Sequence, residues 1–441
     1  MSDTSTPLST AKPVGLGRNH LLAAGIGLVA VIWFLLLSGW LGAAPGTVMM
    51  QRQNVLFNSD TNGWVERMSG DVRPKQFVIH PREVTLWRPP SRAIFYLLTA
   101  FLPPEYAAVF AVKLLVAIVA GSGVGFLAFL ALRSGITIAQ CVLLFTVYLL
   151  FTSNSTACLP EHFGISNGLL SIAFVAPLLT ESTQIRTILL GILAVPIGGT
   201  TITNLLFPLG SFVGYRFKLM RVKLAVLAAG ILGALGVTLF CYKHSSTIFR
   251  IIKYYSNWRL LRDPLKAGAY AIFALVSPAV GPVPLIARIP GWDMVSYEPP
   301  HEPVRLSYYL GIPAASSSFW DRAPLSHFLN GSHYFWLPAI GATAWLALLV
   351  MCAFKGLKDH ETRAPAQLLL GWLLFNVIFH NIWGDEFFLY APHWSWALMG
   401  LSVLGARHLS RTLTAAMAVP IVASQIYTLL SIKSALESIV R

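Results

Sequence analysis

The chain has 441 residues, of which 55% are hydrophobic and only 11% are charged, and its formal net charge is +14. The mean hydropathy of +0.65, together with apolar runs of about 20 residues, excludes a soluble domain and predicts a polytopic membrane protein. The runs are continuously apolar, whereas barrel strands alternate, so the predicted fold class is an all-α transmembrane helical bundle. The basic residues lie in loops, where cytoplasmic retention and lipid phosphates account for them, and no nucleic-acid partner is expected.

Residues 1–20 are polar and are expected to form a flexible cytoplasmic tail, because Lys12 and Arg18 precede the first apolar run. That run, residues 21–41, is too long for the apolar core of a signal peptide and predicts a retained first helix. We expect residues 21–441 to form a single transmembrane domain. Its long outer loops are predicted at about residues 42–106, 242–264, 287–333 and 383–394.

The segment 51–92 concentrates charge of both signs, with four acidic and seven basic residues. In a chain that avoids charge nearly everywhere, this concentration indicates a site. The next segment, residues 93–106, is apolar but short and contains Pro103 and Pro104. It therefore predicts an interfacial helix rather than a span.

The remaining apolar segments bring the predicted total to about 11 spans. Residues 187–214 are broken by prolines and glycines, which favours two short helices with an irregular join. Residues 265–286 contain three prolines and are predicted to re-enter rather than cross, because a simple crossing would move the aromatic-rich loop 287–333 to the cytoplasm. The other segments are expected at residues 107–132, 136–151, 165–179, 224–241, 334–354, 368–382, 396–406 and 413–430.

Asp60 lies in the sequence FNSDTNGW of the first outer loop and is the leading candidate for a general base. A general base requires a carboxylate held close to the hydroxyl that it deprotonates. Capping a short helix is the structural alternative, because Asp is favoured at that position. Asp71, in SGDVRP, is a second candidate for the base or a turn residue before Pro74.

Basic residues later in this loop are candidates for binding a lipid phosphate. A guanidinium group matches phosphate oxygens with paired hydrogen bonds. Ordinary anchoring to membrane headgroups beside Trp87 is the alternative. The candidates are His80, Arg82, Arg88 and Arg92.

A hydrophilic turn at residues 152–164 is expected where a span leaves the membrane on the outer side. It contains Glu161 and His162, which open a helix after Pro160. Both are candidates for substrate binding. A carboxylate in the first turn of a helix is also favoured by the helix dipole, so simple capping is the alternative for Glu161.

Residues 243–262 interleave basic and apolar residues as an amphipathic helix on a membrane surface does. Arg259 or Arg262 could instead pair with a substrate phosphate.

The acidic and aromatic stretch WGDEFFLYAPHW forms the last predicted outer cluster. Asp385 and Glu386 are adjacent, and His393 follows two helical turns later. Adjacent carboxylates can bind a divalent cation, but this spacing does not require one, and no metal or other cofactor is predicted. The four cysteines lie far apart without CxxC or CxxH spacing, which indicates neither a zinc site nor a disulfide framework.

This arrangement resembles the GT-C superfamily, the multi-spanning glycosyltransferases that take a sugar from a polyprenyl-phosphate carrier outside the cytoplasm. The resemblance covers most of the chain as architecture and rests on short motifs. These are the acidic residue soon after the first helix in FNSDTNGW, the His-Pro of VIHPRE, the P-E-x-F step of PEHFG and the turn GDEFFLYAPHW.

The resemblance implies an enzyme of a bacterial inner membrane with its active site facing the periplasm. It assigns the catalytic base to Asp60 and the carrier phosphate to basic residues of the outer loops, without choosing between the groups named above. The implied partners are a polyprenyl-phosphate-linked sugar donor, a glycan or lipid acceptor, and membrane lipids. A transporter or flippase for a lipid-linked glycan is the main alternative, and a non-catalytic membrane scaffold is a third.

Overall fold

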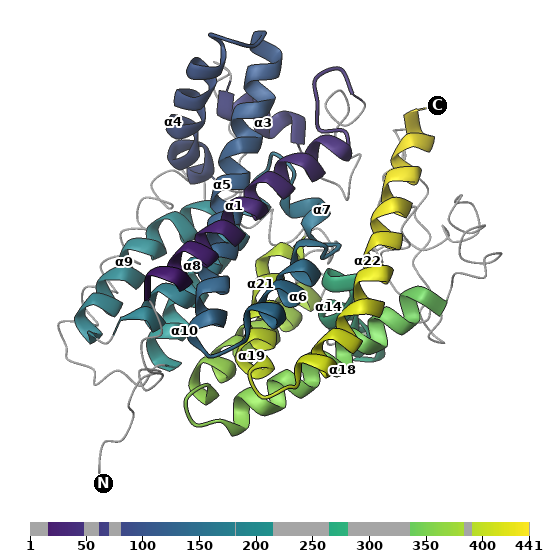
Figure 1. Cartoon of the computed structure of the whole chain (residues 1–441). Helices are drawn as coiled ribbons and strands as arrows, with labels where there is room; N and C mark the ends of the chain where they lie inside the picture. The colour runs from purple at the N-terminus through teal and green to yellow at the C-terminus, as the bar shows by residue number, and fades with distance from the viewer. Residues whose placement is uncertain are drawn as a thin grey trace.

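The computed structural model describes residues 16–47, 61–69, 81–180, 182–214, 264–280, 336–382 and 390–440. This part of the chain is helical and contains no strand (Figure 1). The α-helices are α1 (Leu16–Trp40), α3 (Thr61–Ser69), α4 (Pro81–Leu98), α5 (Pro104–Arg133), α6 (Ile138–Leu149), α7 (Asn154–Ala157), α8 (His162–Val175), α9 (Thr183–Thr200), α10 (Leu206–Gly214), α14 (Pro264–Val280), α18 (Trp336–Lys358), α19 (Arg363–Ile382), α21 (Pro392–Ala406) and α22 (Arg411–Val440). Two short 3₁₀ helices, η1 (Ala176–Leu179) and η2 (Ile202–Leu205), follow α8 and α9.

Six helices in the described ranges are long and apolar enough to cross a membrane, and α6 and α9 are shorter apolar helices. The six lie in α1, α5, α8 with η1, α18, α19 and α22. The prediction of a helical membrane protein is therefore confirmed. The predicted span 224–241, the surface helix 243–262 and the loop 287–333 lie outside the described residues, so the total of about 11 spans stays a prediction.

Two predicted segments can be compared directly with the helices. The irregular join within residues 187–214 is confirmed at Thr201 and η2, between α9 and α10. The bounds of the interfacial helix expected at residues 93–106 are wrong, because residues 93–98 end the longer helix α4 and residues 104–106 begin α5. Its interfacial position stays a prediction. Pro81 begins α4 at the first helical position, where the missing backbone N–H costs nothing.

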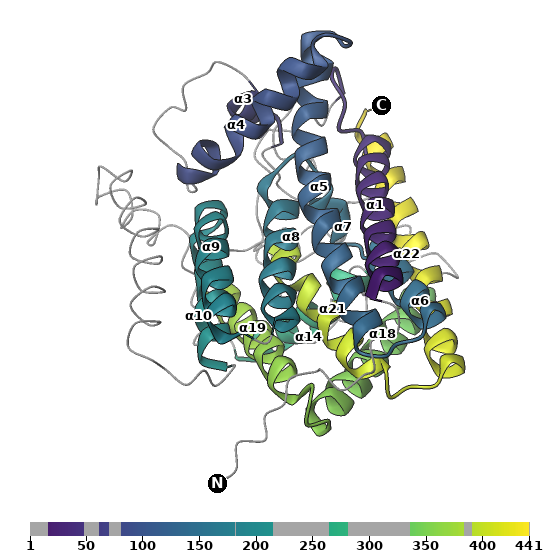
Figure 2. The same ribbon diagram turned by 60° about the vertical axis from the view of Figure 1, so that its left-hand side comes forward.

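Helix α5 lies between α1 and α8, and glycines allow it to approach both (Figure 2). A Cβ atom added to Gly121 would lie 2.9 Å from the carbonyl oxygen of Gly27 in α1. On the α8 side, a Cβ atom added to Gly168 would lie 2.1 Å from the carbonyl oxygen of Val119. Small residues at such contacts let helix backbones pack closely where lipid supplies no hydrophobic driving force.

Helix α14 ends inside the protein. The carbonyl of Ala279 accepts hydrogen bonds from Gln425 of α22 at 2.9 Å and from the backbone of Thr152 at 3.3 Å. The Thr428 hydroxyl donates to the carbonyl of Val280 at 3.0 Å. These partners satisfy the last two described carbonyls of α14 inside the protein. The residues after 280 are outside the described ranges, so the re-entrant path stays a prediction.

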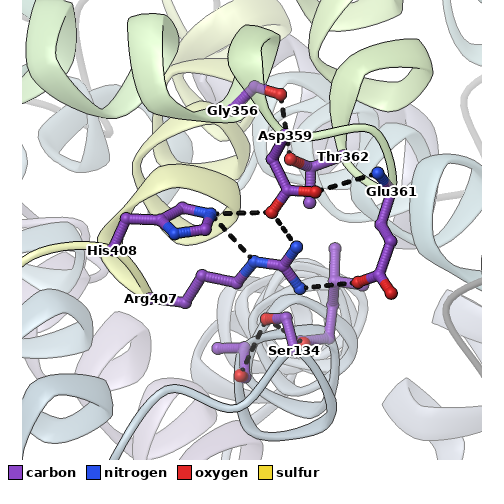
Figure 3. A network of polar contacts seen from close by, with 9 residues as sticks. Ser134, Gly356, Asp359, Glu361, Thr362, Arg407 and His408 are labelled. Carbon is purple, nitrogen blue, oxygen red and sulfur yellow. Dashed lines mark hydrogen bonds and ion pairs between the residues drawn. The ribbon is translucent and has the colours of Figure 1, made fainter. Parts of the chain in front are cut away.

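A polar network joins two turns at one end of the bundle (Figure 3). Arg407, at the end of α21, pairs with Asp359 and donates to Glu361 at 3.0 Å. Both carboxylates lie in the turn between α18 and α19. The network brings together two turns that lie far apart in the sequence.

His408 also belongs to this network. Its Nε2 lies 2.7 Å from Asp359 Oδ2 and 3.1 Å from Arg407 Nε. Partial burial, followed by the charges of Arg407 and Lys355, lowers the pKa of His408.

Replacing Gly168 with alanine tests the close packing of α5 on α8. The added Cβ would collide with backbone, so we expect Gly168→Ala to destabilise the protein by about 1–3 kcal/mol. Gly191→Ala is the matched control, since a Cβ there meets nothing within 4 Å. Thermal unfolding in detergent micelles measures both, and equal stabilities of the two variants would contradict the packing argument.

Removing Arg407 tests the link between the two turns. We expect Arg407→Gln to lower stability by about 1–3 kcal/mol, because Asp359, whose side chain is 14% exposed, loses its charged partner. Arg411→Gln, at an exposed position four residues later, should stay within about 0.5 kcal/mol of the parent protein. The same unfolding measurement compares them, and matching losses would show that the ion pairs do not stabilise the bundle.

Candidate functional site

The turn predicted at the outer water layer is buried instead. Every residue from Phe151 to Glu161 is buried, including the short helix α7. Asn154 donates to the carbonyls of Tyr148 and Leu149 at the end of α6, at 2.6 and 3.1 Å. The hydrophilic turn is therefore enclosed by other helices, and one of its amides satisfies a helix end instead of contacting water.

A buried polar cluster lies where this segment meets the beginnings of α8 and α21. We define the cluster as Glu161, His162, Asn204 and His393. The exposed fractions of Glu161, Asn204 and His393 are only 3%, 1% and 3%. The rings of His162 and His393, near the first residues of α8 and α21, have their centres 6.3 Å apart. Two predicted outer clusters, far apart in sequence, are therefore neighbours.

Glu161 occupies the N-cap position of α8 with an extended backbone, but its side chain makes no capping hydrogen bond to that helix. Glu161 therefore does not cap α8 through a hydrogen bond, although it lies at the end of the helix where the dipole favours a carboxylate. The N-cap residue of α21 is Ala391, which has no side chain able to cap. Two helix N-termini thus meet at the cluster without side-chain caps. The positive ends of the two dipoles favour negative charge there.

His393 is held in place by contacts on several sides. Its Nδ1 lies 3.0 Å from the Asn204 amide nitrogen. Its backbone carbonyl accepts two indole hydrogen bonds, from Trp372 at 2.9 Å and from Trp396 at 2.8 Å. The Tyr390 ring, 6.4 Å from the His393 ring, also stacks on His380. These contacts restrict the orientation of the imidazole.

Asn167 fixes α8 against α21 directly below the cluster. Its amide donates to the Pro392 carbonyl at 3.0 Å and to the Ser395 hydroxyl at 2.9 Å. It also accepts from the Tyr148 hydroxyl of α6 at 3.0 Å. A single amide therefore sets the spacing of three helices, and with it the distance between the two histidines.

Helix α4 of the first outer loop lies over the end of α9 (Figure 2). The indole N–H of Trp87 donates to the Thr200 hydroxyl at 2.9 Å. Thr200 is the last residue of α9, and Asn204 of the cluster lies in η2, which follows it. Arg88, directly after Trp87, is half-buried. The first outer loop is thus connected to the buried polar cluster through the join between α9 and α10.

Arg92 lies on a more exposed part of α4. It donates to the Tyr96 hydroxyl at 2.6 Å and lies 5.5 Å from the centre of that ring. Tyr96 and Leu97 are 58% and 68% exposed. An arginine beside exposed aromatic and aliphatic side chains is typical of a helix anchored at a membrane surface, which was the alternative for this residue.

Several predicted site residues cannot be placed. Only the backbone of Arg82 is described, as part of α4. The residues outside the described ranges are Asp60, His80, Arg259, Arg262, Asp385 and Glu386. The helix α3 begins at Thr61, directly after Asp60.

The sequence analysis missed Asn204 and Asn167 as parts of the site. Both lie in otherwise apolar runs, and Thr201 beside Asn204 lies 3.4 Å from the Ser166 hydroxyl of α8. An amide within an apolar run of a membrane protein is costly unless it has a partner. That signal, rather than charge, could have identified them.

The cluster combines a buried carboxylate, two imidazoles and two uncapped helix N-termini. Such groups can hydrogen-bond hydroxyls, transfer protons and bind an anion. Within the described ranges, no group of three or more His, Cys, Asp or Glu side chains is placed to hold a metal ion. Comparisons with protein-family models, curated proteins and solved structures found no match to this chain.

A double-mutant cycle tests whether Asn204 and His393 act as a pair. We expect Asn204→Ala and His393→Ala to show a coupling energy of about 0.5–3 kcal/mol, because each removes the other's hydrogen-bond partner. Asn204→Ala combined with Gln425→Ala is the control and should be additive within about 0.5 kcal/mol, since Gln425 bonds to α6 and α14 instead. Unfolding in micelles gives all the values, and additivity in both cycles would contradict the pairing.

Proposed function

We propose that this protein is a membrane glycosyltransferase that moves a sugar from a polyprenyl-phosphate carrier to a glycan or lipid acceptor. We place its active site on the periplasmic face of a bacterial inner membrane. The observation that carries the proposal is the buried polar cluster, because it brings two of the predicted outer clusters together at uncapped helix N-termini and connects with α4 of a third. A sugar phosphate presents hydroxyls and an anion, and the cluster offers groups suited to both.

The departing phosphate is the part of the reaction that needs most stabilisation. Negative charge grows on it as the bond to the sugar breaks. The N-termini of α8 and α21 direct backbone N–H groups and positive dipole ends at the cluster, where little water screens them. Half-buried Arg88 directly follows Trp87, which bonds to the end of α9, and we propose it as the guanidinium that meets the departing phosphate. These groups support loss of polyprenyl phosphate without a metal ion.

The acceptor hydroxyl must lose a proton as it attacks. Its oxygen forms the new bond to the anomeric carbon while the bond from that carbon to the phosphate oxygen breaks, and the electron pair leaves with polyprenyl phosphate. Asp60 takes the proton as general base. A single displacement inverts the anomeric centre. Glu161, His162 and His393 hold the hydroxyls of the sugar through hydrogen bonds.

The transporter alternative requires charged groups along a route through the spans. Lys113 is a buried lysine within α5, 8% exposed, and its ammonium donates to the carbonyl of Ala43 at 3.1 Å. Ala43 follows the end of α1, so this charge ties α5 to the segment after α1 and is used in a structural contact. Its position favours an enzyme over a transporter.

Transfer by the purified protein tests the proposal. Supplied with a panel of polyprenyl-phosphate sugars and glycan acceptors in proteoliposomes, the parent protein should form a new glycosidic product. Asp60→Asn should reduce the rate by roughly 10²-fold or more, since a general base contributes that much. Glu105→Gln is the matched control, because Glu105 is an exposed carboxylate in the first turn of α5. It should leave transfer unchanged.

Three results would contradict the proposal in different ways. Normal transfer by folded Asp60→Asn would remove Asp60 as the base. Transfer only from a nucleotide sugar would remove the lipid carrier as donor. Movement of a labelled lipid-linked glycan across the bilayer without any transfer would favour the flippase.

A further inference from the structure

A groove of about 500 Å³ runs along the seam between α1 and α5. Its lining is almost entirely apolar and includes Ala24, Leu28 and Val31 of α1, Phe126 and Phe129 of α5, and Leu179 at the end of η1. Gly27 of α1 and Gly125 of α5 also line the groove, so no side chain fills it at these two positions. The volume lies within the range of about 300–1,000 Å³ that ligand pockets occupy.

The groove opens on a face that contacts lipid. Leu28, which lines the groove, is 61% exposed. Leu21, two helical turns earlier, is 76% exposed. Large exposed aliphatic side chains on a membrane-crossing helix are covered by lipid chains rather than by water. A lipid chain is therefore the component of the surroundings that can enter an apolar groove here.

The length of the groove matches one leaflet of a membrane. Along α1 the lining extends from His20 to Val31, a rise of about 16 Å at 1.5 Å per residue. Half of a hydrocarbon core is about 15 Å thick. A single chain of a lipid in the leaflet at the N-terminal end of α1 would fill this length.

Basic groups gather at the same end of the groove. His20 lines the groove, and the centre of its ring lies 4.5 Å from that of the Phe129 ring. Arg18, two residues earlier in α1, is exposed. Arg133 donates to the carbonyl of Leu179, a lining residue, at 3.4 Å, and Arg186 donates to the carbonyl of the next residue, Thr180, at 2.6 Å. A headgroup at this end meets positive charge, which complements an anionic phosphate.

We propose that this groove binds one acyl chain of an anionic phospholipid, with the headgroup phosphate held at the basic end. The site is separate from the buried polar cluster. The groove lies on the α1 side of α5 and begins at Ser122, whereas the cluster lies beyond α8, which packs on the opposite side (Figure 2). Bound lipid would cover the seam at Gly27 and Gly125, where neither helix has a side chain.

Native mass spectrometry of the delipidated full-length protein tests this proposal. Titration with phosphatidylglycerol should give one tightly bound lipid, and phosphatidylethanolamine should bind more weakly. Ala24→Trp fills the groove from α1, and Ser122→Phe fills it from α5. Each should weaken phosphatidylglycerol binding by about tenfold or more, because several methylenes lose their burial. Arg18→Gln should reduce the preference for the anionic lipid about fivefold.

Val29→Trp is the matched control, since Val29 is 56% exposed on α1 but does not line the groove. It should leave lipid binding unchanged. Equal losses in Val29→Trp and both groove variants would mean that the lipid binds the protein surface without a specific site. Unchanged binding in Ala24→Trp and Ser122→Phe would overturn the proposal, as would displacement of the lipid by inorganic phosphate alone. None of these results depends on whether the protein transfers sugar.

Discussion

The close approach of α5 to its two neighbours is the contact on which the rest of the bundle depends. Gly121 and Gly125 are four residues apart and face α1, whereas Gly123 lies between them and faces Gly168 of α8. The three glycines let one helix pack backbone to backbone on both sides. In a membrane, where apolar side chains gain nothing by leaving lipid, such contacts replace the hydrophobic effect as the source of helix association.

Short helices can then end inside the protein, because buried side chains meet their free backbone groups. Asn154 does this for α6, and Gln425 with Thr428 does it for α14. The first turns of α8 and α21 have no side-chain caps, as is also true of α5 and α7, but these two N-termini meet at the buried polar cluster. Their positive dipole ends favour negative charge there.

The proposed enzyme and the proposed lipid site use the two sides of α5 differently. On the α8 side, the contact between Gly123 and Gly168 and the hydrogen bonds of Asn167 hold the polar groups of the cluster in fixed positions. Such rigidity is what positions a phosphate and a hydroxyl for reaction. On the α1 side, Gly27 and Gly125 have no side chains, and the groove that they line is open to lipid. Here the lining is apolar and a hydrocarbon chain can enter without displacing any protein group.

The amino-acid sequence by itself determined that this is a helical membrane protein and where most of its apolar helices begin and end, and it indicated Glu161, His162 and His393 as candidate site residues in two separate clusters. The lengths of the apolar runs and the positions of prolines indicate where helices begin and end, and both can be read from neighbouring residues alone. Only the tertiary structure decided that residues 151–161 are buried, that Glu161 does not cap its helix and that Asn204 approaches His393. These facts depend on contacts between helices distant in sequence, and no local pattern records which carbonyl or ring a polar side chain will meet.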